Sequence, residues 1–307
     1  MRKTVSLLLA LFVFAGVCRA YSPVIDGALA DVRLKVVDDR GEAVSNAAVS
    51  VTFHVTPEKA DVRRGTTDGD GVFSAKGRCI GEAYAWIRRD GYYETKIAPT
   101  FRKLSYEDAK RTRRWSDGTV ETVAVLKRVR NPVVTAFHLV DYAKIPATNE
   151  IVRLDLETFK WCPPHGDGLH DDLHLFYEVW RNPTNWFSFR KKLTVTAPNC
   201  VDGFYLADVD MTSKMRYEYH ARTNETYVKN IVYEVDRRGG KPDRVELPPD
   251  GCYFTFRMRT ETNELGKVMR ANYGRIGERS DHMFGLRMKA WFNTKINDTN
   301  LEDARLR

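Results

Sequence analysis

Long apolar runs are missing from this sequence once its first twenty residues are passed. No later stretch approaches the roughly 18 to 20 consecutive apolar residues that a membrane helix needs. Residues 1–20, in contrast, combine the basic Arg2 and Lys3, an apolar core from Val5 to Val17, and the small Ala20 before a cleavage point. This pattern predicts a secretory signal peptide, a periplasmic or extracellular location, and no membrane insertion after the signal is removed.

Cysteine is also scarce and lacks the spacing of known cysteine motifs. Four cysteines follow the predicted signal, Cys79, Cys162, Cys200 and Cys252, and no two of them form a C-x-x-C pair. A zinc ribbon or a thioredoxin-like redox motif is therefore not indicated. An oxidising compartment permits up to two disulfides in three connectivities. The alternative, in which the cysteines are free and buried as small hydrophobic residues, stays equally open.

A strong excess of one charge is absent. The full chain carries a formal net charge of +8, and removal of residues 1–20 leaves 46 basic and 41 acidic residues, or +5. This mild excess does not indicate nucleic-acid binding, and an exported protein seldom meets nucleic acid. Two short basic runs, residues 110–114 and 190–192, could attract anionic polymers, although such runs are more often solvated faces.

The sequence motifs of well-known catalytic sites are missing as well. There is no G-x-S-x-G nucleophile elbow, no phosphate-binding P-loop and no dinucleotide-binding fingerprint. The acidic pair Asp68 and Asp70 lacks the ladder of oxygen ligands and the final glutamate of a calcium loop, so a β-turn is favoured there. We therefore predict no cofactor and name no catalytic residue.

What the sequence has in abundance is two-residue alternation. Near the start of the predicted mature chain, Val32, Leu34 and Val36 alternate with Arg33 and Lys35. A second run alternates in the same way, with its apolar side chains at Val49, Val51, Phe53 and Val55. Alternation with many β-branched residues is typical of strands that have one buried face.

These strands and turns carry a resemblance to a known family. The segments VRLKVVDDRGEAVSNAAVSV, TTDGDGVFSAKG and AYAWIRRDGYYE, within residues 30–95, resemble the carboxypeptidase regulatory-like, transthyretin-like β-sandwich. The resemblance implies a seven-stranded sandwich with a structural or binding role and no peptidase activity. Residues 99–118 depart from the pattern, and there Ser105 is expected to cap a short helix. A strand over residues 119–129 completes the predicted domain.

The second half of the chain is also rich in short strand patterns. Residues 173–180 and 284–292 alternate clearly, and a third alternating run at 215–220 predicts another strand. About eight short strands without a long helical period predict a second sandwich-like or barrel-like domain. We therefore expect an all-β protein with a signal peptide (1–20), a transthyretin-like or Ig-like sandwich (21–130) and a β-rich domain of unknown function (131–307).

A second resemblance covers this half. The segments RLDLETFKWCPPHGDG, FRMRTETNELGKVMRANYGRIGE and WFNTKINDTNLE resemble, in this order, a family of uncharacterised exported bacterial proteins. Members pair a regulatory-like sandwich with a β-rich C-terminal region. The resemblance implies export and this domain layout, and it assigns no catalytic residue.

The stretch PHGDGLHDDLH, residues 164–174, concentrates three of the seven histidines with three aspartates. A metal centre formed by His165, His170 and His174 is one reading, because these side chains are common zinc ligands. The favoured reading is a polar turn that enters a strand, with Gly166 and Gly168 at the turn and the polar side chains in water. A hydrolytic site near residues 165–174 would also need paired carboxylates at a distance that sequence does not reveal.

Aromatic side chains offer the other candidate site. Trp180 and Trp186 flank a loop, and Arg190 follows it, so these three residues are the candidates to bind a ligand such as a sugar. The alternative is that the tryptophans belong to the core, as aromatic residues on strands more often do. The favoured function is an exported, non-enzymatic binding or structural protein that engages polysaccharide or another exported protein. The alternative is a secreted hydrolase of carbohydrate or peptide with its site near residues 165–174.

Overall fold

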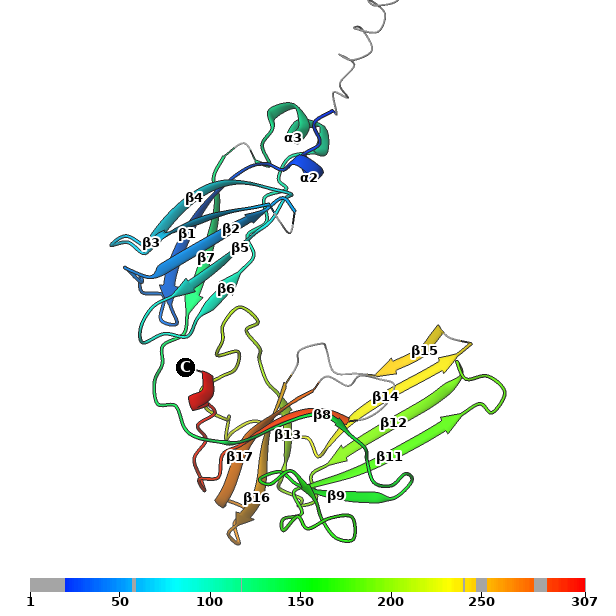
Figure 1. Cartoon of the computed structure of the whole chain (residues 1–307). Coiled ribbons are helices and arrows are strands. Elements are labelled where there is room, and N and C mark those ends of the chain that lie inside the picture. The colour runs from blue at the N-terminus through cyan, green and yellow to red at the C-terminus, as the bar shows by residue number, and fades with distance from the viewer. Residues whose placement is uncertain are drawn as a thin grey trace, which may run out of the picture. The chain divides into compact units, whose positions relative to one another are not determined.

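The computed structural model describes residues 20–56, 59–116, 118–239, 241–246, 253–278 and 286–306. The predicted signal peptide lies outside this part except for Ala20, and so does Cys252. The chain divides into a first unit, Met1–Arg128, and a second unit, Val129–Arg307. Both units are built from β-sheets (Figure 1), which confirms the predicted all-β class. Within the described residues, no helix is long and apolar enough to cross a membrane.

The first unit is a sandwich of two sheets. One sheet has the strand order β4-β1-β7, and the other has the order β3-β2-β5-β6. Neighbouring strands are antiparallel except β1 and β7, which run parallel. The strands are β1 (Ala28–Asp38), β2 (Ala48–His54), β3 (Ala60–Thr66), β4 (Val72–Cys79), β5 (Ala83–Arg88), β6 (Thr95–Ile97) and β7 (Val120–Leu126).

Alternation along the strands explains the core of this unit. Val32, Leu34 and Val36 on β1 and Val51 and Phe53 on β2 are completely buried, as predicted. Together with alanines from β4 and β5 and two apolar residues of β7, they fill the space between the two sheets. The sandwich is not entirely antiparallel, because β7 pairs with β1 in parallel.

Two short helices accompany the sandwich. They are α2 (Pro23–Asp26) and α3 (Tyr106–Thr112). Ser105 caps α3, as the sequence predicts, because its hydroxyl accepts a hydrogen bond from the backbone N–H of Asp108 at 3.1 Å. The helix ends at Arg113, which takes the left-handed conformation.

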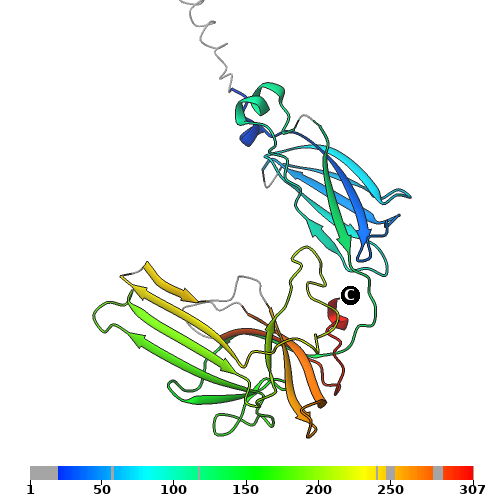
Figure 2. The same ribbon diagram turned by 180° about the vertical axis from the view of Figure 1, so that it is seen from behind.

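The second unit contains a six-stranded sheet, β10-β9-β11-β12-β14-β15, and a five-stranded sheet, β13-β16-β17-β18-β8. All neighbours are antiparallel, and Figure 2 shows β14 and β15 at one edge of the larger sheet. The bounds are β8 (Ala136–Ala143), β9 (Ile151–Asp155), β10 (Lys160–Trp161), β11 (Leu173–Arg181), β12 (Phe189–Thr196), β13 (Gly203–Leu206), β14 (Asn230–Arg238), β15 (Lys241–Glu246), β16 (Tyr253–Thr262), β17 (Val268–Glu278) and β18 (Leu286–Phe292), with a 3-10 turn at Ala304–Leu306.

One buried cluster joins both sheets of this unit. Leu154, Leu173 and Val195 come from the six-stranded sheet, and Phe256 and Phe292 come from the five-stranded sheet. The predicted strand at residues 215–220 is wrong. That segment is irregular, and its alternate side chains at 215 and 217 are buried without pairing into a sheet.

Candidate functional site: a basic aromatic groove on the first unit

The four-stranded sheet of the first unit has one face in the core and one face in solvent. On β5, Ala83, Ala85 and Ile87 are buried, so the residues between them point outward. Cross-strand register places Ser50 of β2 opposite Trp86 of β5. The outward face therefore gathers side chains from every strand of this sheet, namely Ser50, Thr52 and His54 from β2, Val62 and Arg64 from β3, Tyr84, Trp86 and Arg88 from β5, and Lys96 from β6.

A row of three half-buried rings crosses this face. The rings of His54 and Tyr84 meet edge to face with centroids 5.8 Å apart, and those of Tyr84 and Trp86 lie 6.1 Å apart. The ammonium of Lys96 lies 4.8 Å from the centroid of Tyr84 and 4.9 Å from that of Trp86. These cation–π contacts hold the rings in place from the β6 side.

On the β2 and β3 side of Trp86, the face is hollowed into an open groove of about 490 Å³. Trp86 lines the groove from β5, Arg64 lines it from β3, and Ser50 and Thr52 belong to the central strand β2 between them. Arg88 follows Trp86 along β5 on the same face. The other lining residues are small or apolar, at positions 48, 49, 62 and 65. We call this site the Trp86 groove.

The charged residues that line the Trp86 groove are all basic. Its lining holds two arginines and no acidic residue. Arg88 forms an ion pair with Glu94, whereas Arg64 has no carboxylate partner within the described residues. The groove therefore offers a free guanidinium beside an aromatic wall. Guanidinium groups bind carboxylate, sulfate and phosphate oxygens through two parallel hydrogen bonds.

This arrangement suits binding better than catalysis. An indole wall stacks on the apolar face of a sugar ring, and nearby hydroxyls and guanidinium groups fix polar substituents. Acid–base hydrolysis of a glycosidic bond commonly uses two carboxyl groups facing each other across the bond. The lining of the groove supplies neither of them.

The aromatic residues predicted as ligand contacts lie in the second unit. Trp180 is at the end of β11 with 55% of its surface exposed, and Trp186 in the following loop is 82% exposed. Arg190 is opposite Trp180 in register, but its guanidinium is bound to the buried Glu234 at 2.8 Å. Their role in ligand binding stays a prediction.

The histidines at 165, 170 and 174 are engaged separately. The imidazole of His165 lies 3.5 Å from Glu150, and that of His174 lies 3.0 Å from Asp171. His170 lies at the loop, where its backbone carbonyl accepts a hydrogen bond from the Cys162 thiol. In the described parts of the chain, no group of three or more histidine, cysteine or acidic residues is arranged to hold a metal ion.

Asp172 corrects the prediction that the polar side chains of this stretch face water. Only 2% of Asp172 is exposed, and both of its oxygens bind the guanidinium of Arg259, at 2.8 and 2.9 Å. The same guanidinium reaches Glu157 at 2.7 Å and Asp155 at 3.5 Å. The segment from the end of β9 to the start of β11 brings all three acids to one arginine of β16.

Backbone groups complete this buried cluster. Asp155 accepts hydrogen bonds from the backbone N–H groups of Leu169 at 3.1 Å and Glu157 at 2.9 Å. Burial alone would raise the pKa of Asp155, but these bonds and those from Thr158 hold it below its ordinary value. The cluster is therefore a structural contact in which Asp155 and Asp172 have hydrogen-bond partners, and it ties the loop after β9 to β16.

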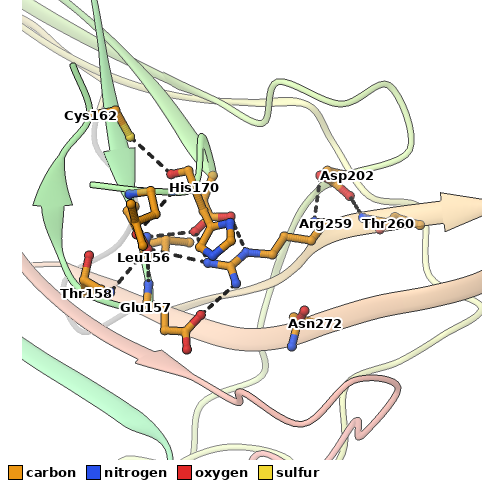
Figure 3. Close-up of polar contacts among 12 residues, drawn as sticks. Leu156, Glu157, Thr158, Cys162, His170, Asp202, Arg259, Thr260 and Asn272 are labelled. Carbon is orange, nitrogen blue, oxygen red and sulfur yellow. Dashed lines mark hydrogen bonds and ion pairs between the residues drawn. The ribbon is translucent and has the colours of Figure 1, made fainter. Parts of the chain in front are cut away.

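Arg259 is positioned by a bulge in β16. It has a φ of 55°, and the register with β17 shifts between Met258 and Glu261. Asp202 accepts the backbone N–H groups of Arg259 and Thr260 at 3.0 Å each, which holds the bulge (Figure 3). Burial nevertheless raises the pKa of Asp202 above its ordinary value.

Asp68 and Asp70 lie in a turn, where the Asp68 carboxylate accepts hydrogen bonds from the backbone N–H groups of Asp70 at 3.0 Å and Val72 at 2.8 Å.

The three described cysteines are free, with Cys79 and Cys162 buried and Cys200 exposed. Burial raises the pKa of the Cys79 thiol to about 11, so it is an inert thiol at neutral pH.

Sequence reasoning missed the Trp86 groove although its signal was present. Tyr84, Trp86 and Arg88 alternate with the apolar residues at 83, 85 and 87, and the polar face of residues 50–54 is equally regular. What the sequence lacked was the pairing that sets β2 between β3 and β5. Alternation shows which residues face solvent, and only the strand order shows which of them meet.

No family model matches the sequence, and no curated protein matches it. The resemblance of residues 30–95 to the regulatory-like sandwich therefore stays a prediction.

Solved structures give distant matches to β-rich proteins. 3-Chlorocatechol 1,2-dioxygenase from Rhodococcus opacus is 14% identical, over 34% of this chain and 61% of that one, with a TM-score of 0.25. The major pilin subunit BcpA of Bacillus cereus is 13% identical over 90% and 100%, with a TM-score of 0.25. A candidate carbohydrate-binding protein from Bacteroides uniformis is 8% identical over 89% and 99%, with a TM-score of 0.19. The chain thus spans about three fifths of the dioxygenase, and scores this low support no functional argument.

Proposed function

We propose that this is an exported, non-enzymatic binding protein whose first unit holds an acidic polysaccharide in the Trp86 groove. One observation carries the proposal: an indole ring and two arginines line the same hollow, and the lining contains no carboxylate. Stacking selects a ring, and the unpaired guanidinium of Arg64 selects a negative substituent on it. The predicted signal peptide supports a location where such polymers occur.

A hydrolase with its site at residues 165–174 finds less support. In that stretch, both carboxylate oxygens of Asp172 accept hydrogen bonds from the guanidinium of Arg259. A general acid or base has to reach a proton of the substrate, and a carboxylate in a buried bidentate ion pair does not. The favoured class is therefore a binding protein.

The test uses one polymer in two charge states. Polygalacturonate and its methyl ester share a backbone, and only the first carries carboxylates. We expect the mature protein to bind polygalacturonate, with an affinity that falls as salt rises, and to bind the ester at least about tenfold more weakly. Isothermal titration calorimetry measures both.

Variants locate the site. Trp86→Ala should weaken polygalacturonate binding by about tenfold or more, and Arg64→Gln by a smaller factor. Trp186→Ala is the matched control, because Trp186 is more exposed but lies outside the groove. If Trp186→Ala removes binding and Trp86→Ala does not, the site predicted at Trp180 and Trp186 is the better assignment. No binding of either polymer would reject polysaccharide of this kind as the ligand.

A further inference from the structure

The loop between β11 and β12 carries the most exposed aromatic surface of the second unit. Trp186 is 82% exposed, its neighbour Phe187 is 72% exposed, and Trp180 at the end of β11 is 55% exposed. We call residues 180–190 the hairpin tip, and Figure 1 shows it at the free end of the six-stranded sheet. Three large rings in solvent within one hairpin form the kind of apolar patch that marks an interaction surface.

The backbone of the hairpin tip is ordered by its own polar groups. The Asn182 side chain accepts hydrogen bonds from the backbone N–H groups of Thr184 at 2.9 Å and Asn185 at 3.2 Å. The Ser188 hydroxyl accepts the N–H of Gly239 at 3.0 Å, which ties the tip to the turn after β14. The aromatic side chains are therefore presented on a fixed loop, so that little conformational entropy is lost when they bind.

Cations surround one residue at the base of the tip. Phe189 pairs in register with Arg181 on one side and Arg237 on the other, so these three side chains share a face of the sheet. The guanidinium of Arg237 lies 5.7 Å and the ammonium of Lys191 lies 5.4 Å from the Phe189 ring centroid. Burial, and then the nearby Arg181, lower the pKa of Lys191.

Two carboxylates at this end of the sheet, Glu234 and Asp236, pair with arginines other than Arg181 and Arg237. Glu234 is bound to Arg190 at 2.8 Å, and Asp236 lies 3.8 Å from Arg238. Arg181 and Arg237 have no carboxylate within ion-pair distance among the described residues, and the buried Nε of Arg237 has no hydrogen-bond partner there. The tip thus combines exposed aromatic rings with two guanidinium groups that have no carboxylate partner among the described residues.

We propose that the hairpin tip attaches the protein to an anionic phospholipid surface, with Trp186 and Phe187 at the depth of the headgroups and Arg181 and Arg237 bound to lipid phosphates. Tryptophan favours the boundary between apolar and wet surroundings, and basic residues add attraction to anionic lipids. Charge complementarity favours this occupant over a neutral partner. Attachment at the surface differs from the membrane insertion that the sequence argues against, and it is independent of the Trp86 groove.

Vesicle co-sedimentation tests the proposal on the mature protein. We expect binding to phosphatidylcholine vesicles that contain phosphatidylglycerol, with a marked loss at high salt, and little binding to phosphatidylcholine alone. The double change Trp186→Ser and Phe187→Ser should weaken binding by about tenfold or more, because each ring buries apolar area at the interface. Arg181→Gln with Arg237→Gln should remove the preference for phosphatidylglycerol.

Leu265→Ser provides the matched control. Leu265 is 91% exposed in the turn between β16 and β17 and lies outside the hairpin tip. This variant should bind vesicles as the parent protein does. Equal binding to both vesicle types, unchanged binding by the double aromatic variant, or aromatic-dependent self-association without vesicles would each overturn the proposal. Circular dichroism of every variant separates loss of binding from loss of fold.

Discussion

The Trp86 groove of the first unit and the Arg259 cluster of the second unit both gather charged side chains, yet they differ in how these charges are satisfied. In the cluster, one guanidinium contacts three acids, and two of these, Asp155 and Asp172, are almost fully buried. In the groove, Arg64 faces solvent without a carboxylate partner among the described residues. A stretch rich in polar residues can therefore form a structural contact in which every charge is paired. The outward face of an alternating strand, in contrast, can keep a charged side chain available for a ligand.

The largest effect is expected from removing the centre of the cluster. Arg259→Met leaves Asp155 and Asp172 buried without their cation, and breaking a buried ion pair in this way costs about 3 to 5 kcal/mol of unfolding free energy. Urea unfolding of the parent and the variant measures it. Arg153→Ala is the control, because its pairing with Asp171 spans 3.8 Å on the surface and should contribute less than about 1 kcal/mol.

A polar loop without a structural role would give a different result. If Arg259→Met and Arg153→Ala lower stability equally and slightly, the cluster does not hold the loop after β9 to β16. Asp172 would then be available for chemistry, and the contrast between the two regions would lose its basis.

A smaller effect is expected in the core beneath the groove. Val51→Ala should lower the unfolding free energy of the first unit by about 1 to 3 kcal/mol, because a completely buried side chain is truncated and a cavity remains. Thr52→Ala, on the outward face of the same strand, should change stability much less. Denaturant unfolding monitors both. A neutral result for Val51→Ala would mean that the two faces of β2 are assigned in reverse.

Two aspartates of the second unit should respond to pH in opposite directions. The folded pKa of Asp155 is below its ordinary value of 3.8, so its stabilising contribution is full above that value and is lost as pH falls through the lowered pKa. The folded pKa of Asp202 is raised, so its contribution is greatest below pH 3.8 and declines as pH rises through the raised pKa.

The corresponding asparagine variants sharpen the contrast. Asp155→Asn should be more destabilising at pH 7 than at pH 3, and Asp202→Asn should be less destabilising at pH 7 than at pH 3. Thermal unfolding at both pH values, each compared with the parent protein, provides the measurement. The same pH trend for the two variants would contradict the assigned pKa directions.

Much of the fold could be predicted from the sequence, because alternation and burial are local properties. The inward faces of β1 and β2, the capped helix at Ser105 and the all-β class all follow from short stretches. The parallel pairing of β7 with β1 could not be predicted, since it depends on where a distant segment returns. The irregular course of residues 215–220 was missed because alternate burial also occurs in chain that forms only an isolated bridge, here between His220 and Asn300, and no strand.

The candidate site was harder to predict for the same reason. Residues 164–174 attracted attention because histidine and aspartate are dense there, but density does not reveal that Asp172 meets Arg259 from a strand far along the chain. Trp86 and Arg64 lie more than twenty residues apart and meet only because β2 lies between their strands. Residue type indicated the chemistry, and strand order decided where it could occur.

Hydrogen–deuterium exchange with a bound oligogalacturonate tests the central claim most directly. If the Trp86 groove is the binding site, backbone amides of β2, β3 and β5 should exchange more slowly in the complex, while those of residues 165–174 should be unchanged. Protection of residues 165–174, with no change in β2, β3 and β5, would contradict the account and return the functional site to the histidine–aspartate stretch.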